Sequence, residues 1–454
     1  MKCTTMCLLL AVFVFTACNN DNKPGTVLLK HVTLIDGKGG APVEMTDVLI
    51  QGDTIAAIGT GQDVPGAEVI DLSGKTIMPA MISTHVHVGT LKGTTTVPEN
   101  YTRENILAQL KQYEDYGVGT LLAMGTDRPM LFETGLRDSS LNGLLPGARL
   151  HSAGYGFGVP DGAPPLNFAM DKVFRPATPE DVPAAVDSVV KLHPDVIKMW
   201  VDDFGGRYKQ KLSPAIYSRI IEEAHKHGIR VATHLYYLAD ARQLVAAGVD
   251  IIGHSIRDKE VDDTLLAMMK KQGTVYIPTL SLDEFAYIYA RKPEWMNNAF
   301  FKHSLQPGVY EMISAPAYQD SLKNSPGYAK NVAAFEMALR NLKKIFEAGI
   351  LVSLGTDSGA MPLRAQGFSE HLELELMVQA GLTPLQAISV ATENAAKVLR
   401  IESRYGTLQK GMVADLIVLG GNPVTDIKNT RAIEAVYKAG KKVSSGPLAT
   451  QTVK

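Results

Sequence analysis

The chain has 454 residues, of which 45% are hydrophobic and 20% charged, and its formal net charge is −2. This length allows one large globular domain with a deep core and a smaller appendage. The near-neutral charge gives no sign of nucleic-acid binding, so a nucleic acid is not an expected partner.

The first residues have the features of a processing signal. Lys2 supplies a positive charge, residues 8–15 are apolar, and Thr16, Ala17 and Cys18 are suited to cleavage. The apolar run is too short for a permanent membrane-spanning helix. The segment resembles a bacterial lipoprotein signal, in which Cys18 becomes the lipidated first residue; an ordinary secretory signal cut nearby is the alternative.

This signal predicts where the protein resides. We expect a signal peptide at residues 1–18 and a polar tether at 19–26. The lipid would anchor the protein to a membrane of the cell envelope, on the periplasmic or cell-surface side.

All three cysteines (Cys3, Cys7 and Cys18) lie in the signal segment. The remaining chain therefore has no disulfide and no cysteine metal ligand, so any metal must be held mainly by histidine or carboxylate.

Both ends of the chain carry short β-strand signals. Residues 27–75 contain several apolar runs separated by glycine-rich turns, and residues 405–447 contain a second set. Neither end has enough strands to bury a face alone. We therefore expect one small composite domain, a β-sandwich built from both chain ends.

Between these ends, residues 76–404 alternate between strand and helix. The helices have Ser/Thr-Pro starts at residues 178–179 and 213–214, and glycines end several of them. Eight strand–helix units predict an α/β fold, a (β/α)8 TIM barrel. The expected strands are 77–87, 118–124, 149–153, 196–201, 229–235, 249–255, 275–280 and 351–357. The long connection at 281–330 is either a partial lid over the active face or a surface excursion.

Chemically capable side chains lie at the ends of several predicted strands. In a strand, residues i and i+2 point to one side, so His85 and His87 direct two imidazoles at one point. Barrel active sites gather at such strand ends. Each residue alone has an ordinary structural explanation, but all of these together indicate a metal site. The full set is His85, His87, Lys198, His234, His254 and Asp357.

Lys198 needs a separate explanation. A cationic ammonium is costly among apolar strand residues and would be repelled by metal ions. The position suits a neutral amine, or one that has reacted with carbon dioxide. The resulting carbamate is an anionic ligand with two oxygens, able to bridge two metals.

The order of these residues resembles the binuclear metal-dependent amidohydrolase superfamily, and within it the imidazolonepropionase-like or prolidase-like group. The motifs Leu34-Ile35-Asp36-Gly37 and Gly406-Thr407-Leu408 strengthen the likeness. It implies two divalent metal ions, with zinc favoured. By this resemblance His85, His87 and Asp357 bind the first metal, carbamylated Lys198 bridges, and His234 and His254 bind the second. Residues 155–165 lack the Gly-Gly-His often found after the third strand.

The resulting hypothesis is a hydrolase of C–N bonds, rather than an ester specialist, acting on dipeptides or N-acyl amino acids. A metal-bridging hydroxide would attack the carbonyl, with Asp357 as proton shuttle and Tyr236 as oxyanion donor. Arg257, Arg207 and Arg364 are candidates for binding a substrate carboxylate. The alternatives are a lactonase, a ring amidohydrolase or deaminase of the same fold, and a non-catalytic envelope binding protein. Self-association into a homo-oligomer is compatible with the sequence.

Overall fold

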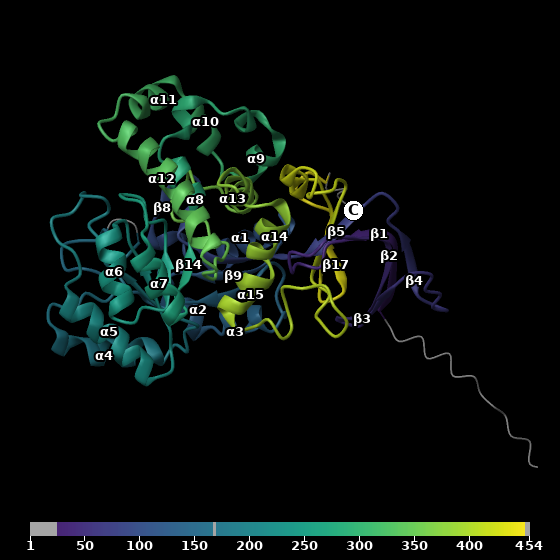
Figure 1. Cartoon of the computed structure of the whole chain (residues 1–454), viewed down its shortest axis with the longest axis horizontal. Helices are drawn as coiled ribbons and strands as arrows, with labels where there is room; N and C mark the ends of the chain where they lie inside the picture. Colours follow the sequence, from purple (N-terminus) through teal and green to yellow (C-terminus); the bar gives the residue numbers. More distant parts are fainter. Residues whose placement is uncertain (1–24, 167–168, 450–454) are drawn as a thin grey trace, which may run out of the picture.

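The computed structural model describes residues 25–166 and 169–449. The predicted lipidation site, Cys18, and most of the predicted signal and tether lie outside these residues. The described chain forms a β-rich part beside a larger part of alternating strands and helices (Figure 1). Within the described residues, no helix is both long enough and apolar enough to cross a membrane.

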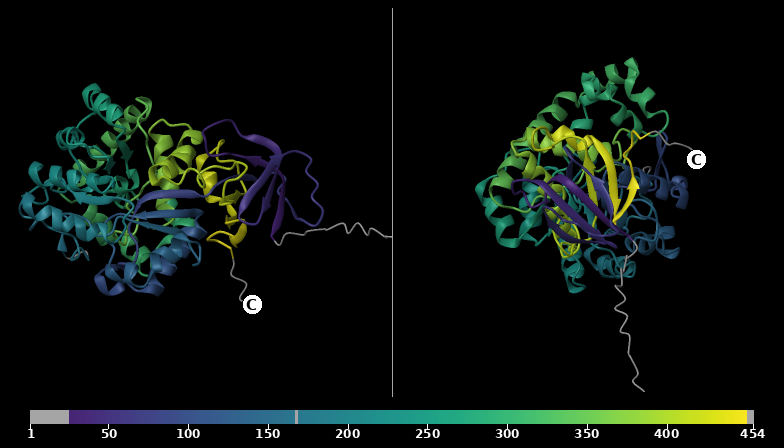
Figure 2. Two further views of the ribbon diagram at one scale, coloured as in Figure 1. Left: turned by 90° about the horizontal axis from the view of Figure 1, so that it is seen from below. Right: turned by 90° about the vertical axis from the view of Figure 1, so that its right-hand side faces the viewer.

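Strands from both regions of the sequence pair in one eight-stranded sheet, with the order β17-β16-β15-β5-β1-β2-β3 and with β4 paired to β1. Figure 2 shows the purple N-terminal strands beside the yellow C-terminal strands. The members are β1 (Thr26–Leu34), β2 (Val43–Gln51), β3 (Thr54–Gly59), β4 (Glu68–Asp71), β5 (Thr76–Pro79), β15 (Leu416–Leu419), β16 (Ile433–Lys438) and β17 (Lys441–Ser444).

This sheet differs from the expected β-sandwich because its strands are joined by backbone pairing into one sheet rather than two. The reason is β5, which pairs in parallel with the end of β1 and antiparallel with β15. It therefore links the two sets of strands. The sheet has its own apolar core, which includes Leu29, Val48 and Leu416. The residue limits of the two domains stay a prediction.

The expected first barrel strand, 77–87, is two strands with different partners. β5 belongs to the small sheet, whereas β6 (Met81–Val86) pairs in parallel with β9 (Val118–Ala123). Between them, the Ala80 amide donates to the Asp415 carbonyl at 3.0 Å and the Met81 amide donates to the Gly117 carbonyl at 2.9 Å. The chain therefore changes sheets at Ala80.

Two short strands, β7 (Leu91–Lys92) and β8 (Thr95–Thr96), form an antiparallel pair, and the other strands form two parallel sheets. One has the order β10-β9-β6, with β10 at Arg149–Ser152, and the other has the order β11-β12-β13-β14. The latter comprises β11 (Ile197–Trp200), β12 (Val231–His234), β13 (Ile251–Gly253) and β14 (Val275–Ile277). A parallel bridge between Phe157 and Met199 connects the two sheets on one side.

The expected eighth strand, 351–357, is not a regular strand. Parallel bridges connect Val352 to Tyr276 and Ser358 to Val86. The Thr84 amide donates to the Leu354 carbonyl at 2.8 Å. This segment therefore lies between β14 and β6, an arrangement consistent with a TIM barrel. Only isolated bridges pair this segment, and Asp357, just before the second of them, has a left-handed φ of 58°.

The main helices alternate with these strands, as the sequence predicts. They include α1 (Arg103–Asp115), α4 (Val182–Val190), α5 (Pro214–Lys226), α6 (Leu238–Ala246), α7 (Asp263–Gln272), α12 (Tyr328–Glu347), α13 (Phe368–Gln379), α14 (Pro384–Ala391) and α15 (Glu393–Leu399). The predicted Ser-Pro start is confirmed at α5, where the Ser213 side chain accepts a hydrogen bond from the Ile216 amide.

The long connection after β14 is helical. It contains α8 (Leu280–Phe285), η4 (Ile288–Arg291), η5 (Glu294–Asn297), α9 (Ala299–Ser304), α10 (Val309–Ser314) and α11 (Pro316–Lys323), and α9, α10 and α11 lie at the top of Figure 1. Trp295 packs against Phe301 and Phe368 with ring centroids 4.8 and 5.1 Å apart. The connection is thus a packed layer, and its first helix, α8, borders the cavity described below.

A buried ion pair between Arg149 and Asp415 ties the barrel strand β10 to the segment leading into β15. Asp415 also accepts a hydrogen bond from the Ala439 amide at 2.7 Å. Asp415→Ala should lower the free energy of unfolding by about 3 kcal/mol or more, because Arg149 would remain buried without its carboxylate. Denaturant titration followed by circular dichroism measures this change.

The matched control is Asp53→Ala, because Asp53 is exposed and lies 3.8 Å from Arg404 in a surface ion pair. Its loss should change the free energy of unfolding by less than about 1 kcal/mol. Equal effects of the two substitutions would show that the buried pair does not stabilise the junction.

Candidate active site

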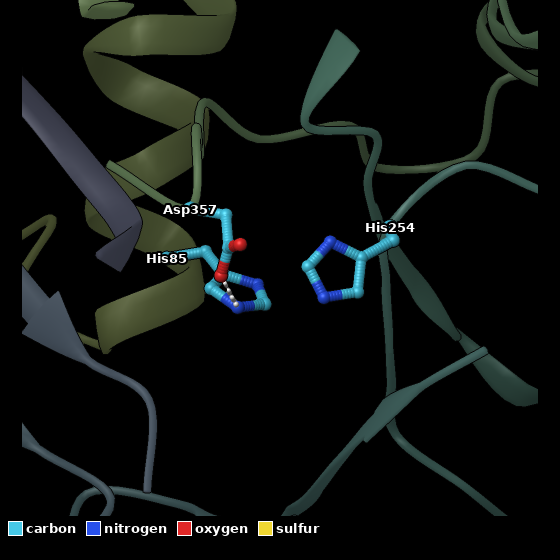
Figure 3. Close-up of side chains that lie close together, drawn as sticks. All are labelled: His85, His254 and Asp357. Atoms are coloured by element: carbon cyan, nitrogen blue, oxygen red, sulfur yellow. Dashed lines mark ion pairs between the residues drawn. The ribbon is translucent and has the colours of Figure 1, made fainter. Parts of the chain in front are cut away.

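The barrel brings three of the predicted metal ligands into one buried cluster. His85 comes from β6, His254 follows β13, and Asp357 lies in the irregular eighth segment. One ligand atom from each residue lies within 4.8 Å of the others. In Figure 3 the Asp357 carboxylate lies beside the His85 ring, and His254 approaches from the opposite side. Three segments far apart in sequence therefore meet at one point.

The other predicted histidines lie next to this cluster. His87 Nε2 is 2.8 Å from Asp357 Oδ1, while His85 Nε2 is 3.4 Å from the same oxygen. The ring of His234 lies 4.2 Å, centroid to centroid, from that of His254, which lies 4.5 Å from that of His85. All four imidazoles are thus gathered around one small volume.

Lys198 is fully buried beneath these rings, on β11. Its Nζ lies 3.5 Å from His85 Nε2. Burial lowers the pKa of Lys198 to about 7, although Asp357 and Asp202 oppose that shift. A Cβ at Gly125 would approach the Lys198 side chain to 2.8 Å, so glycine there leaves room for the lysine stem. A neutral, nucleophilic amine is therefore accessible near neutral pH.

Three of the histidines have the protonation state that a metal requires. Burial is the largest cause of their lower pKa, which falls to about 3 for His85, to well below the ordinary value for His254, and in the same direction for His234. Neutral imidazoles have free lone pairs for a metal. In addition, His85 Nδ1 is buried without a hydrogen-bond partner among the described residues. The donor set therefore fits divalent cations.

Asp357 is held as a carboxylate. Burial alone would raise its pKa, but the ion pair with Arg364 and the contacts with His87 and His85 lower that pKa well below the ordinary value. Asp357 and His254 both have left-handed backbones, with φ of 58° and 75°. Such conformations are costly for residues other than glycine and are concentrated at functional sites. The fold therefore accepts the conformational cost of a left-handed backbone at both residues, and both side chains point into the cluster.

Neighbouring threonines orient two of the rings, and the sequence alone did not indicate them. His87 Nδ1 is 2.7 Å from the Thr126 hydroxyl, and His254 Nδ1 is 2.8 Å from the Thr279 hydroxyl. With Nδ1 so engaged, Nε2 is the free atom of His254. Both threonines lie just after strands that neighbour the histidine strands, which is the signal that could have found them.

Asp202 is a further residue that sequence reasoning missed. It is fully buried two residues after β11, and its Oδ1 lies 3.2 Å from His234 Nε2. Its second oxygen has no hydrogen-bond partner among the described residues. Its position just beyond the predicted strand that carries Lys198 is the sequence signal that could have identified Asp202 as a site residue.

A cavity of about 260 Å³ opens beside the cluster. His87, His234 and Asp357 line it, and so do Tyr236 and all three predicted arginines. The rest of the lining is largely apolar and includes Met170, Trp200, Phe204, Leu282, Ala286, Ala334 and Met361. The structure therefore places the predicted metal ligands and the predicted substrate contacts at one site.

The three arginines differ in their partners. Arg364 pairs with Asp357, and Arg257 Nε lies 3.0 Å from Asp283 Oδ1. Arg207 is exposed and forms no ion pair within the part of the chain that the structure describes; its guanidinium lies 5.8 Å from the Tyr208 ring centroid. The Tyr236 ring contacts the Arg257 guanidinium at 4.6 Å, centroid to carbon. Arg207 is thus the arginine that has a free charge for a ligand.

Comparisons with known proteins agree with this geometry. Residues 76–443 match the Amidohydrolase family. An ochratoxinase from Aspergillus niger is 30% identical over 237 residues, which are 51% of this chain and 41% of that protein. An imidazolonepropionase from Deinococcus deserti is 27% identical over 214 residues, 46% of each chain. The chain thus spans less than half the length of these two relatives.

A solved structure extends the likeness over nearly the whole chain. The crystal structure of a Xaa-Pro dipeptidase with methionine bound in its active site has a TM-score of 0.72 and 26% identity. It covers 92% of this chain and 99% of the dipeptidase. The chain belongs to the Amidohydrolase family. The predicted family resemblance is thereby confirmed.

Proposed function

We propose that this protein is a metal-dependent hydrolase of the amide bond in dipeptides or N-acyl amino acids. The observation that carries the proposal is the gathering of four histidines, a buried lysine and an ionised aspartate beside a cavity whose lining includes an arginine without an ion pair among the described residues. The similarity to a Xaa-Pro dipeptidase over almost the full length of both chains supports a peptide-like substrate.

The residues of the cluster suit two divalent metal ions, for which zinc is favoured by the imidazole ligands. His85, His87 and Asp357 would hold one, and His234 and His254 the other. Lys198, neutral at moderate pH because it is buried, would add carbon dioxide and bridge as a carbamate. When bound, such metals lower the pKa of a water molecule from 15.7 toward about 7 and so supply hydroxide at neutral pH.

The protein's own groups then position the substrate and move the proton. Asp357, kept ionised by Arg364, is the base that accepts the proton of the attacking water and passes it to the leaving nitrogen. Tyr236 lines the cavity and donates its phenolic hydrogen to the carbonyl oxygen. Arg207 binds the substrate carboxylate, because the carboxylates of Asp357 and Asp283 already pair with Arg364 and Arg257.

Metal removal and replacement test this function. Protein dialysed against a chelator should lose hydrolysis of dipeptides and N-acyl amino acids by at least about 100-fold, since the metals supply the hydroxide. Zinc or another divalent cation should restore the activity, and metal analysis should give two ions per chain. Activity that survives complete metal removal would contradict the proposal. Hydrolysis of lactones without any amide would instead identify the lactonase alternative.

We also propose that the protein is lipid-anchored through Cys18, because Thr16 and Ala17 precede this cysteine at the end of an apolar run. Cys18→Ala should release soluble protein or leave the chain unprocessed, as seen by membrane fractionation and gel mobility. Cys7→Ala, in the same signal, is the control and should leave the fractionation unchanged. A processed Cys18→Ala chain that still sediments with membranes would contradict the lipid anchor.

A further inference from the structure

Asp283 is a buried carboxylate in the cavity wall that neither the metal cluster nor the proposed proton transfer uses. It lies on α8, the first helix of the long connection after β14, and only 5% of the residue is exposed. It lines the same cavity as His234, Tyr236 and Asp357. A substrate held at the cluster therefore lies within the same enclosed space as this carboxylate.

One oxygen of Asp283 is engaged and the other is not. Oδ1 lies 3.0 Å from Arg257 Nε. Oδ2 is buried and has no hydrogen-bond partner among the described residues. The hydroxyl of Ser255, which also lies near Asp283, donates its hydrogen to the Pro278 carbonyl at 2.8 Å. A residue that lines the cavity thus has a carboxylate oxygen without a donor among the described residues.

Arg257 is fixed by its other contacts and does not supply the missing donor. Its Nη1 group donates to the Ser255 carbonyl at 2.9 Å, and its guanidinium stacks on the Tyr236 ring. The arginine therefore holds Asp283 in place from one side. Burial raises the pKa of Asp283 to about 6, and the charge of Arg257 acts against that rise. At neutral pH the group is mainly ionised.

An unpaired buried carboxylate oxygen carries a desolvation penalty, which a cationic donor removes on binding. An ammonium group satisfies both the hydrogen bond and the charge. An N-acylated nitrogen keeps one N–H donor but is neutral, so it leaves the charge of the Asp283 carboxylate without compensation. The free oxygen therefore favours one kind of ligand over the other.

We propose that Asp283 Oδ2 accepts a hydrogen bond from the α-ammonium group of the substrate, so that this site selects dipeptides with a free N-terminus over N-acyl amino acids. The inference rests on the proposed amide-hydrolase function and narrows its substrate class. Arg207 supplies the complementary cation in the same cavity. One acidic and one basic group then match the two charged ends of a dipeptide.

The alternative role for Asp283 is to act as counter-ion of Arg257 and nothing more. In that case its substitution would disturb both kinds of substrate alike, because Arg257 would shift whichever substrate is bound. The ratio of the two activities therefore separates substrate recognition from a structural role, whereas the absolute activity does not.

The test compares leucyl-phenylalanine with N-acetyl-leucyl-phenylalanine, which share the scissile bond, the leaving residue and the carboxylate. In metal-loaded wild type, kcat/KM should be at least about 100-fold higher for the free amine, as expected when a buried polar group loses its partner. Asp283→Asn should reduce this ratio at least about tenfold. Asp320→Asn, an exposed position on α11, is the matched control and should keep the wild-type ratio.

A wild type without preference for the free amine overturns the inference, whether or not the variant folds. A ratio unchanged in a folded Asp283→Asn protein overturns it too. If wild type hydrolyses neither compound, calorimetric measurement of the binding of leucine and N-acetyl-leucine tests whether the ammonium site exists. If wild type binds leucine more tightly than N-acetyl-leucine and Asp283→Asn removes this preference, the ammonium site is upheld although the proposed function fails. Equal binding of the two ligands by wild type rejects the site.

Discussion

Asp357→Asn should reduce turnover of an amide substrate by about 10²–10⁴-fold, the usual contribution of a positioned general acid–base. The substitution keeps the side-chain size but removes the charge that Arg364 stabilises and the basic oxygen beside His87. The protein should retain much of its metal, because His85, His87, Lys198, His234 and His254 remain. Steady-state kinetics together with metal analysis of the same preparation measures both quantities.

The leaving group supplies the internal control for this prediction. An amine must be protonated to depart, whereas an activated aryl oxide leaves without help, so an aryl ester should lose less activity than an amide in Asp357→Asn. Asp63→Asn, at an exposed position in the connection between β3 and β4, removes the same charge and should have no effect. Near-normal amide turnover by Asp357→Asn at full metal occupancy would contradict the role of Asp357 as proton shuttle.

Lys198→Ala should lose most of the bound metal and most of the activity. The side chain is fully buried and lies 3.5 Å from His85, so no other described group can take the place of a bridging carbamate without rearrangement. A short carboxylic acid such as acetate or propionate should partly restore metal content and activity, because it offers two anionic oxygens in the space vacated by the lysine. Metal analysis and kinetics with and without the acid measure this.

Two observations separate ligand loss from a packing defect. Lys198→Met retains an apolar chain of similar length without a nitrogen, so it should also lose metal but should not respond to the carboxylic acid. The mass of the acid-denatured wild type should show unmodified lysine, because carbamates decompose in acid. Unimpaired metal content in Lys198→Ala would rule out a bridging role.

The alternation of strands and helices could be predicted from sequence because the signals are local. The Ser213-Pro214 start of α5, for example, depends only on neighbouring backbone atoms. The site could be located for a related reason: strand ends in a barrel share one face, so residues such as His85, His234 and His254 had to converge once the fold class was recognised. The roles assigned to them, the lipid at Cys18 and the domain limits stay predictions.

Only the tertiary structure decided where regular pairing stops and which charges meet. The change of sheet at Ala80 depends on hydrogen bonds to Asp415 and Gly117, and the eighth segment is paired only by isolated bridges and includes a left-handed backbone at Asp357. Likewise, the predicted arginines were equivalent in sequence, but packing pairs Arg364 with Asp357 and Arg257 with Asp283 and leaves Arg207 free. Such contacts join residues far apart in the chain, and they follow from side-chain geometry and burial rather than from any local periodicity.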